Sequence, residues 1–137
     1  MDGYSNLETL AAQVSINKDA YPNTNFNDAD FSVGVQGAKN LDECLALNVP
    51  EGAGDNFKTT TTIGGQTFYS ATGGGAAAGN RYDTKTYRTF KDNMCYELTE
   101  TIHTGAIENY DPSVSEINKN PIWTKLDAIT QSFTFTK

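Results

Sequence analysis

Alternation of apolar and polar side chains in the second half of the chain predicts β-strands joined by tight turns. KTTTTI (58–63) and QTFYSA (66–71) are rich in β-branched and aromatic residues, which favour strands. Gly64 and Gly65 lie between them and suit a two-residue hairpin turn, because such turns need positive φ angles. This segment therefore predicts a first β-hairpin.

A second hairpin is predicted from YDTKTYRTF (82–90) and MCYELTETIH (94–103). With Asp92 and Asn93 as the turn residues, opposite charges and pairs of threonines face one another across the strands. The predicted pairs are Arg88 with Glu97, Lys85 with Glu100, Thr86 with Thr99, and Thr84 with Thr101. Each such pair stabilises a sheet by roughly 0.2–1 kcal/mol, so this register is favoured over a slip of one residue.

The first half of the chain mixes strand and helix patterns. TLAAQVSI (9–16) alternates like a strand, but it also has apolar residues at helical spacing after a capping box formed by Ser5 and Glu8. FSVGV (31–35) alternates cleanly and predicts a strand. AKNLDECLAL (38–47) places its leucines at near-helical spacing and predicts a short amphipathic helix, followed by a loop, NVPEGAGDN (48–56).

The C-terminal segment predicts a helix and then a strand. Asn120 can cap a helix and Pro121 suits its first position, while Ile122, Trp123, Leu126 and Ile129 form one apolar stripe. SFTFT (132–136) alternates and predicts a final strand. Together the elements predict one α+β domain over residues 1–137, with an antiparallel sheet of about five to six strands packed against two or more helices in an α/β/α sandwich-like arrangement.

The glycine-rich stretch SATGGGAAAGN (70–80) raises the question of phosphate binding. A phosphate-binding loop needs Lys followed by Ser or Thr after its last glycine, whereas Asn80 and Arg81 follow here. The dinucleotide-binding pattern is also missing, because the run leads into a strand instead of a long helix. We therefore predict a loop or a single helical turn that joins the two hairpins and forms a mobile lip beside the sheet.

Charge and hydropathy exclude some classes of function. The net charge of −7 and a pI near 4.5 argue against nucleic-acid binding, which requires a basic patch. No apolar run approaches the roughly 18 residues that a membrane-spanning helix needs. The acidic composition is compatible with a homo-oligomer, and the partner that we expect is a protein or a small molecule.

Cys44 and Cys95 are the two cysteines, and neither lies in a metal-binding motif. They are either two separate buried thiols or a disulfide. A bridge would close a loop of about 50 residues and stabilise the fold by roughly 4 kcal/mol in the chain-entropy model. The composition, rich in Thr, Asn and Gly, favours the disulfide and an extracytoplasmic location; a cytoplasmic location is the alternative.

Four residues are candidates for ligand binding: Tyr82, Arg88, Glu97 and His103. Alternation puts Glu97 and His103 on one polar face of their strand, which we expect to be exposed, and the register places Arg88 beside Glu97. Tyr82 has an amphipathic ring suited to a ligand or partner. His103 is the only histidine and supplies at most one metal ligand, so no metal site and no cofactor are predicted. No catalytic motif is present either.

Several short motifs give the chain a resemblance to a known group. NTNFNDADFSVG, the lone Cys44, Tyr87-Arg88-Thr89, CYELTETIHTG and LDAITQSFTF resemble a group of small, uncharacterised bacterial extracytoplasmic proteins, and the closing helix followed by SFTF is similar to the PsbP-like α/β/α sandwich. The motifs extend from about Thr24 to Phe135. The resemblance implies a curved antiparallel sheet between helices, no established enzymatic activity, and a strand over TLAAQVSI.

The leading functional hypothesis is a non-enzymatic, extracytoplasmic module that binds a partner or small ligand on its sheet face or in a concavity beside it. One alternative is a small hydrolase or isomerase in which Glu97 or Glu100 acts with His103, since acid–base catalysis requires two converging groups. The other alternative is an oligomeric structural protein.

Overall fold

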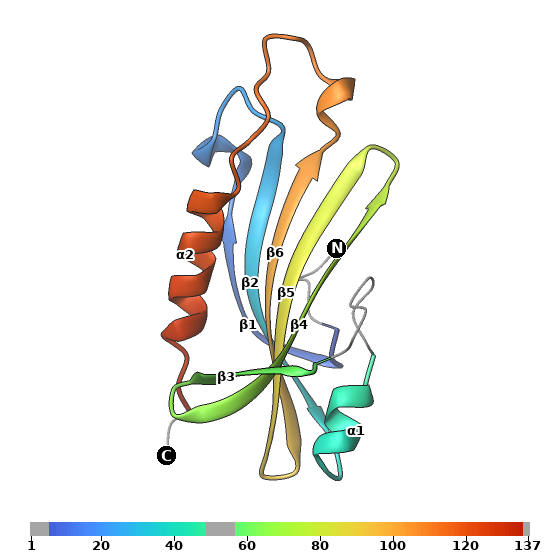
Figure 1. The fold of residues 1–137 in the computed structure, drawn as a ribbon, viewed down its shortest axis with the longest axis vertical. Helices are drawn as coiled ribbons and strands as arrows, with labels where there is room; N and C mark the ends of the chain where they lie inside the picture. The colour runs from blue at the N-terminus through green and yellow to red at the C-terminus, as the bar shows by residue number, and fades with distance from the viewer. Residues whose placement is uncertain (1–5, 49–56, 136–137) are drawn as a thin grey trace.

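The computed structural model describes residues 6–48 and 57–135, which form one antiparallel six-stranded sheet with the order β1-β2-β6-β5-β4-β3 (Figure 1). The strands are β1 (Thr9–Ile16), β2 (Phe26–Gly37), β3 (Thr59–Ile63), β4 (Gln66–Ala77), β5 (Asn80–Lys91) and β6 (Met94–Gly105). The helices are α1 (Leu41–Ala46) and α2 (Asn120–Gln131), with single 3₁₀ turns η1 (Lys18–Ala20) and η2 (Ile107–Asn109). The predicted α+β fold with an antiparallel sheet is confirmed.

Three consecutive hairpins build the larger part of the sheet. Each turns on two residues with positive φ: Gly64-Gly65, Ala78-Gly79 and Asp92-Asn93. Such turns match the right-handed twist of the strands they join. The predicted register of the β5–β6 hairpin is confirmed at every pair, Arg88 with Glu97 and Lys85 with Glu100 included.

The two α-helices cover opposite faces of the sheet. Ile122 and Leu126 of α2 are buried against Leu98 and Ile102, which point to one face of β6. Cys44 of α1 instead packs on Cys95, which points to the other face of the same strand. In Figure 1, α2 runs along the length of the sheet, whereas α1 lies near the end where β5 turns into β6.

The local sequence explains where the helices begin. Asn40 caps α1, because its side chain accepts a hydrogen bond from the Glu43 amide at 2.8 Å. Helix α2 has a proline in its first turn, where the missing N–H leaves no hydrogen bond unmade. It begins at Asn120, one residue earlier than expected, with Lys119 at the cap position.

Two sequence predictions about the ends of the chain had different outcomes. The ambiguous segment 9–16 is a strand, β1, paired antiparallel with β2. The strand predicted over 132–136 is wrong, because residues 132–135 form no strand. Phe133 and Phe135 pack with Phe68 of β4 instead, so the alternation of the tail reflects burial against the core. Residues 49–56 of the loop predicted over 48–56, and Ser5 of the capping box, lie outside the described residues.

The glycine-rich stretch is also different from the prediction. Most of it is strand, since β4 continues to Ala77 and pairs with β5 as far as Asn80. A turn residue with positive φ is usually Asn, Asp or Gly, and here Ala78 takes one of the two turn positions. The sequence therefore lacked the usual signal for a hairpin between the two expected ones.

The face of the sheet opposite α2 is polar, as predicted, but its centre is not exposed. Ser32, Thr99 and Thr86 form one row across β2, β6 and β5, and all three are buried. Thr101 and Asp30 in the neighbouring row are buried as well. The expectation of an exposed sheet face around Glu97 is therefore wrong.

Candidate functional site

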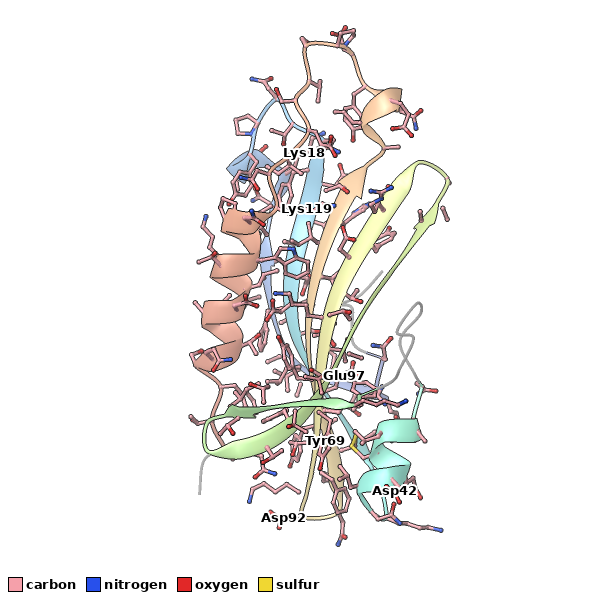
Figure 2. All side chains as sticks on the ribbon, viewed as in Figure 1. Lys18, Asp42, Tyr69, Asp92, Glu97 and Lys119 are labelled. Atoms are coloured by element: carbon pink, nitrogen blue, oxygen red, sulfur yellow. A yellow bond between two sulfur atoms is a disulfide. The ribbon has the colours of Figure 1, made fainter. Side chains whose placement is uncertain are left out.

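Arg88 and Glu97, two of the predicted ligand-binding residues, form a fully buried ion pair. Arg88 Nε donates to Glu97 Oε2 at 2.7 Å, and both side chains have zero exposure. Glu97 Oε1 accepts further hydrogen bonds from the amide and side chain of Asn6 and from Thr99 Oγ1. Figure 2 shows Glu97 in the half of the sheet where α1 lies, away from the end where Lys119 lies.

The guanidinium of Arg88 also holds the end of α1. Its Nη1 donates to the Cys44 carbonyl at 3.0 Å and to the Leu47 carbonyl, and its Nη2 donates to the Asn48 carbonyl at 3.0 Å. The last carbonyls of a helix have no partners within the helix, so a buried cation there satisfies them. Arg88 and Glu97 thus connect the sheet, α1 and the N-terminal segment, and a ligand has no access to them.

The structure joins Cys44 and Cys95 by a disulfide, with a Cα–Cα distance of 5.2 Å. Both cysteines are buried in a small second core with Leu7 and Ala38. The bridge fixes α1 to β6 close to the Arg88–Glu97 pair. Mass measurement after alkylation without reductant tests it, since a bridged protein gains no alkyl groups.

Tyr82 and His103, the other two predicted residues, do meet. They face each other across β5 and β6, with ring centroids 4.4 Å apart and nearly parallel planes. His103 Nδ1 lies 3.0 Å from Asp28 Oδ2, and its Nε2 lies 2.8 Å from Asn80 Oδ1. His103 therefore connects Asn80, the first residue of β5, with Asp28 of β2.

The groups required by the enzymatic alternative do not converge. Glu97 and His103 lie on the same face of β6, but six residues of extended strand separate them by about 20 Å. Glu100 points to the opposite face, where Thr130 Oγ1 of α2 donates to its Oε2 at 2.6 Å. No pair of these groups shares a position from which both could act on one substrate.

Glu100 is a buried carboxyl beneath α2. Burial is the main cause that raises its pKa from 4.5 to about 8, and the neighbouring Asp127 carboxyl adds to the rise. Lys85 opposes the shift, and it pairs with Asp127 at 3.3 Å. Burial, together with the neighbouring carboxyl groups of Glu100 and Asp127, also raises the pKa of Tyr87 to about 12. The helix is thus docked over a carboxyl group that is mostly protonated at neutral pH.

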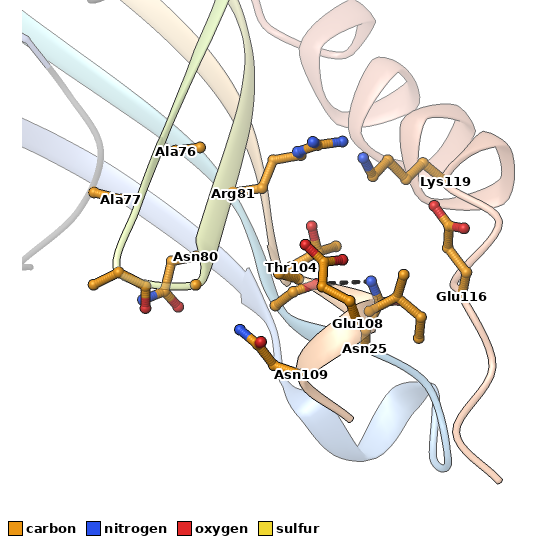
Figure 3. Close-up of a pocket in the computed structure, with 15 residues that line it drawn as sticks. Asn25, Ala76, Ala77, Asn80, Arg81, Thr104, Glu108, Asn109, Glu116 and Lys119 are labelled. Atoms are coloured by element: carbon orange, nitrogen blue, oxygen red, sulfur yellow. Dashed lines mark hydrogen bonds between the residues drawn. The ribbon is translucent and has the colours of Figure 1, made fainter. Parts of the chain in front are cut away.

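A pocket of about 450 Å³ lies at the other end of the sheet, between the β4–β5 turn and the segment that joins β6 to α2. This volume is in the range of sites for small ligands. Residues 76–81 form one wall, and this wall includes the end of the glycine-rich stretch. Residues 104–109 with Glu116 and Lys119 form the other (Figure 3).

Asn25 organises the frame of this pocket. Its Nδ2 donates to the Gly105 carbonyl at 2.8 Å, and its Oδ1 accepts from the Ile117 amide at 2.8 Å. The Gly105 amide in turn donates to the Asn25 carbonyl at 2.9 Å. One buried side chain therefore connects the start of β2, the end of β6 and the segment before α2.

Two glycines lie in the walls of the pocket at positions where a side chain would collide with a neighbour. A Cβ on Gly105 would lie 2.2 Å from Tyr110 Oη, so the Tyr110 ring packs where a side chain would stand. Gly79 has a φ of +80°, and its carbonyl accepts from the Ala106 amide at 2.8 Å. The glycine-rich stretch thus contributes a wall of small residues fixed by the backbone.

Four charged side chains line the pocket, and three of them have no ion pair with any residue that the structure describes. These three are Arg81, Glu108 and Glu116, whereas Lys119 Nζ donates to Asp83 Oδ2 at 2.7 Å. Figure 3 shows Arg81 and Lys119 pointing toward each other, while Glu108 and Glu116 project into the same space. The pocket therefore presents both charge signs.

No direct signal in the sequence predicted this pocket. Its charged residues come from a strand and from an irregular segment, so no periodic pattern connects them. Two signals were present but could not be interpreted alone: the run of small residues before Asn80, and the many turn-forming residues between 106 and 120. Of the four predicted ligand-binding residues, none lines the pocket, although His103 contacts Asn80 in its wall.

Comparisons with known proteins give little further information. No protein-family model matches the chain, and no curated protein matches it. Among solved structures, LpqN of Mycobacterium tuberculosis, described as involved in cell envelope biogenesis, is similar with 15% identity and a TM-score of 0.47. The match covers 86% of this chain and 67% of LpqN. Such a distant likeness supports no functional conclusion.

Residues 6–48 and 57–135 include no helix with the length and apolarity that a membrane crossing requires.

Proposed function

We propose that this domain is a non-enzymatic binding module whose pocket at the β4–β5 turn holds a small zwitterionic ligand, such as a short peptide with free amino and carboxyl termini. The observation that carries the proposal is that one pocket of suitable size holds charges of both signs without an ion pair to any other described residue. An anionic group would pair with Arg81, and a cationic group would pair with Glu108 and Glu116. Arginine suits the anionic end because its planar guanidinium can bind a carboxylate with two hydrogen bonds.

The residues that line the pocket and the rigidity of its walls support binding more than catalysis. The described residues that line the pocket include no histidine, cysteine or serine, and the two carboxylates among them are exposed. Hydrogen bonds from the Asn25 side chain and from the Gly105 amide hold the segments around the pocket together, so the walls are in place before a ligand arrives. Such preorganisation lowers the entropic cost of binding.

We also propose an extracytoplasmic location and a distant relation to the PsbP-like group. The disulfide between Cys44 and Cys95 supports the location, since such bonds persist in oxidising compartments. The short motifs quoted above support the relation, together with an antiparallel sheet that has a helix on each face.

Calorimetric titration with triglycine tests the binding proposal. The free peptide carries an ammonium and a carboxylate, whereas its N-acetylated and C-amidated forms each lack one of the two charges. We expect triglycine to bind and each blocked form to bind roughly tenfold or more weakly, since a hydrogen bond to a charged group contributes about 1.5–3 kcal/mol. Equal binding of all three forms, or no binding of triglycine, would contradict the proposal.

Variants connect each charge to its residue. Arg81→Ala should weaken triglycine binding and abolish the difference between triglycine and its C-amide. Glu116→Gln should also weaken triglycine binding, and it should abolish the difference between triglycine and its N-acetylated form. Lys39→Ala and Glu8→Gln are matched controls, because they remove one exposed charge of the same sign outside the pocket. If the controls weaken binding as much as the pocket variants do, the effect comes from net charge and the assignment is wrong.

A further inference from the structure

Strand β1 forms one edge of the sheet, and its outer side has no neighbouring strand in the described structure. All its residues from Thr9 to Ser15 are exposed, and Ile16 is half-buried. Leu10 and Val14, at 39% and 48% exposure, are the exposed large hydrophobic residues of the described chain, and both belong to this strand. An edge strand also presents a row of unpaired backbone N–H and C=O groups.

This edge lacks the charged residues and the proline that normally keep edge strands from pairing between molecules. Residues 9–17 contain no charged residue and no proline in a chain whose net charge is −7. Natural edge strands are usually protected by lysine, proline or a short length. β1 has a bulge between Leu10 and Ala12, but from Ala12 to Ile16 it pairs regularly with β2.

The opposite edge is different. β3 has five residues against eight in β1, and it follows Lys58 directly. Its one large apolar residue, Ile63, is buried. The C-terminal segment also lies against its turn, since a Cβ on Gly64 would come within 2.4 Å of the Phe133 carbonyl. The two edges therefore differ in length, apolar exposure and cover.

We infer that β1 is a self-association edge, at which two copies of this chain pair their β1 strands antiparallel and extend the sheet across a twofold axis. The occupant is a second copy because the uncharged edge is where two molecules of charge −7 can approach with the least repulsion. Pairing also covers Val14, which is 48% exposed, and supplies partners for the outward backbone groups of β1, which have no neighbouring strand among the described residues.

The regular part of β1 fixes the register of this pairing. A twofold axis at Val14 places Val14 opposite its own copy, Gln13 opposite Ser15, and Ala12 opposite Ile16. Ala12, Val14 and Ile16 share the α2 side of the sheet, and Gln13 and Ser15 share the other side. Apolar residues thus meet apolar residues, and polar residues meet polar ones.

Sedimentation velocity of the full chain over a concentration series, from about 10 µM to about 1 mM, tests the inference in the range expected for a small interface. The mass should rise from 14.9 kDa toward twice that value. Val14→Lys should remain monomeric at every concentration, because the axis at Val14 places two like charges directly opposite each other. Thr62→Lys, the matched change on an exposed residue of β3, should associate like the unmodified chain.

Hydrogen exchange of the unmodified chain gives a second measurement that needs no variant. Amides of residues 9–16 should exchange more slowly at the high concentration, whereas amides of residues 59–63 should not change. A monomer mass at about 1 mM, or dissociation by Thr62→Lys but not by Val14→Lys, would overturn the inference. Concentration-dependent protection confined to β3 would overturn it as well.

Discussion

At the scale of single residues, the register that pairs Arg88 with Glu97 was predicted correctly, but the predicted role of the pair in ligand binding was not supported. The charges do face each other as the register requires. Their burial depends on α1 and on Asn6, which lie 40 residues or more away along the chain. Surface ion pairs contribute little to stability, but breaking a buried pair leaves an uncompensated charge in the interior.

Removing one partner of this pair should be costly. Glu97→Gln should lower the free energy of unfolding by about 3–5 kcal/mol, because Arg88 then stays buried without its counter-charge. Urea denaturation measures this change. The double variant Arg88→Met with Glu97→Leu should recover part of the loss, since it removes both charges. A cost under about 1 kcal/mol for Glu97→Gln would show that the pair behaves like an exposed one.

At the scale of elements, the β4–β5 hairpin shows why a glycine-rich segment can be a strand. Gly74 pairs with Asp83, and a Cβ at this position would lie 2.5 Å from the Tyr82 carbonyl oxygen. The two backbones therefore approach each other too closely for a side chain. Glycine here serves a close backbone contact in a sheet, which the composition of the segment alone cannot distinguish from a flexible loop.

Gly74→Ala should therefore destabilise the protein by about 1–3 kcal/mol, the usual cost of forcing a methyl group into filled space. Gly37→Ala is the matched control, because an added Cβ there meets nothing within 4 Å and the residue does not have positive φ. Thermal unfolding of both variants measures the difference. Equal stability of the two variants would mean that the backbone can move apart at Gly74 without cost.

At the scale of the whole molecule, a buried carboxyl group beneath α2 makes the stability of the fold depend on pH. Glu100 is fully buried between β6 and Thr130 of α2. Because its folded-state pKa is raised to about 8, the folded protein holds this proton more tightly than the unfolded chain does. The stabilising contribution is complete below the ordinary pKa of 4.5 and is lost as the pH rises through about 8.

The free energy of unfolding should accordingly fall by up to a few kcal/mol between about pH 4.5 and pH 8. Glu100→Gln should flatten this part of the profile, because the amide resembles the protonated acid and does not titrate. Other carboxyl groups titrate in both proteins, so the difference between the two profiles isolates Glu100. A wild-type stability that rises over this interval relative to Glu100→Gln would contradict the assigned direction.

The sequence alone determined the features that depend on neighbouring residues in a strand or helix. Alternation and turn residues predicted the β3–β4 and β5–β6 hairpins, and charge pairing predicted the register of the latter. The helix at 120–131 followed from its proline and apolar stripe. These signals are local, so they do not depend on how distant segments are arranged.

Only the tertiary structure decided which polar residues are accessible and where a pocket forms. Arg88 and Glu97 were predicted to be accessible to a ligand, but in the structure α1 and the N-terminal segment cover them. The pocket requires Asn25, Gly79 and Gly105 to meet, although as many as 80 residues separate them in the chain. Burial and convergence arise from contacts between distant segments, and a pattern of nearest neighbours carries no information about them.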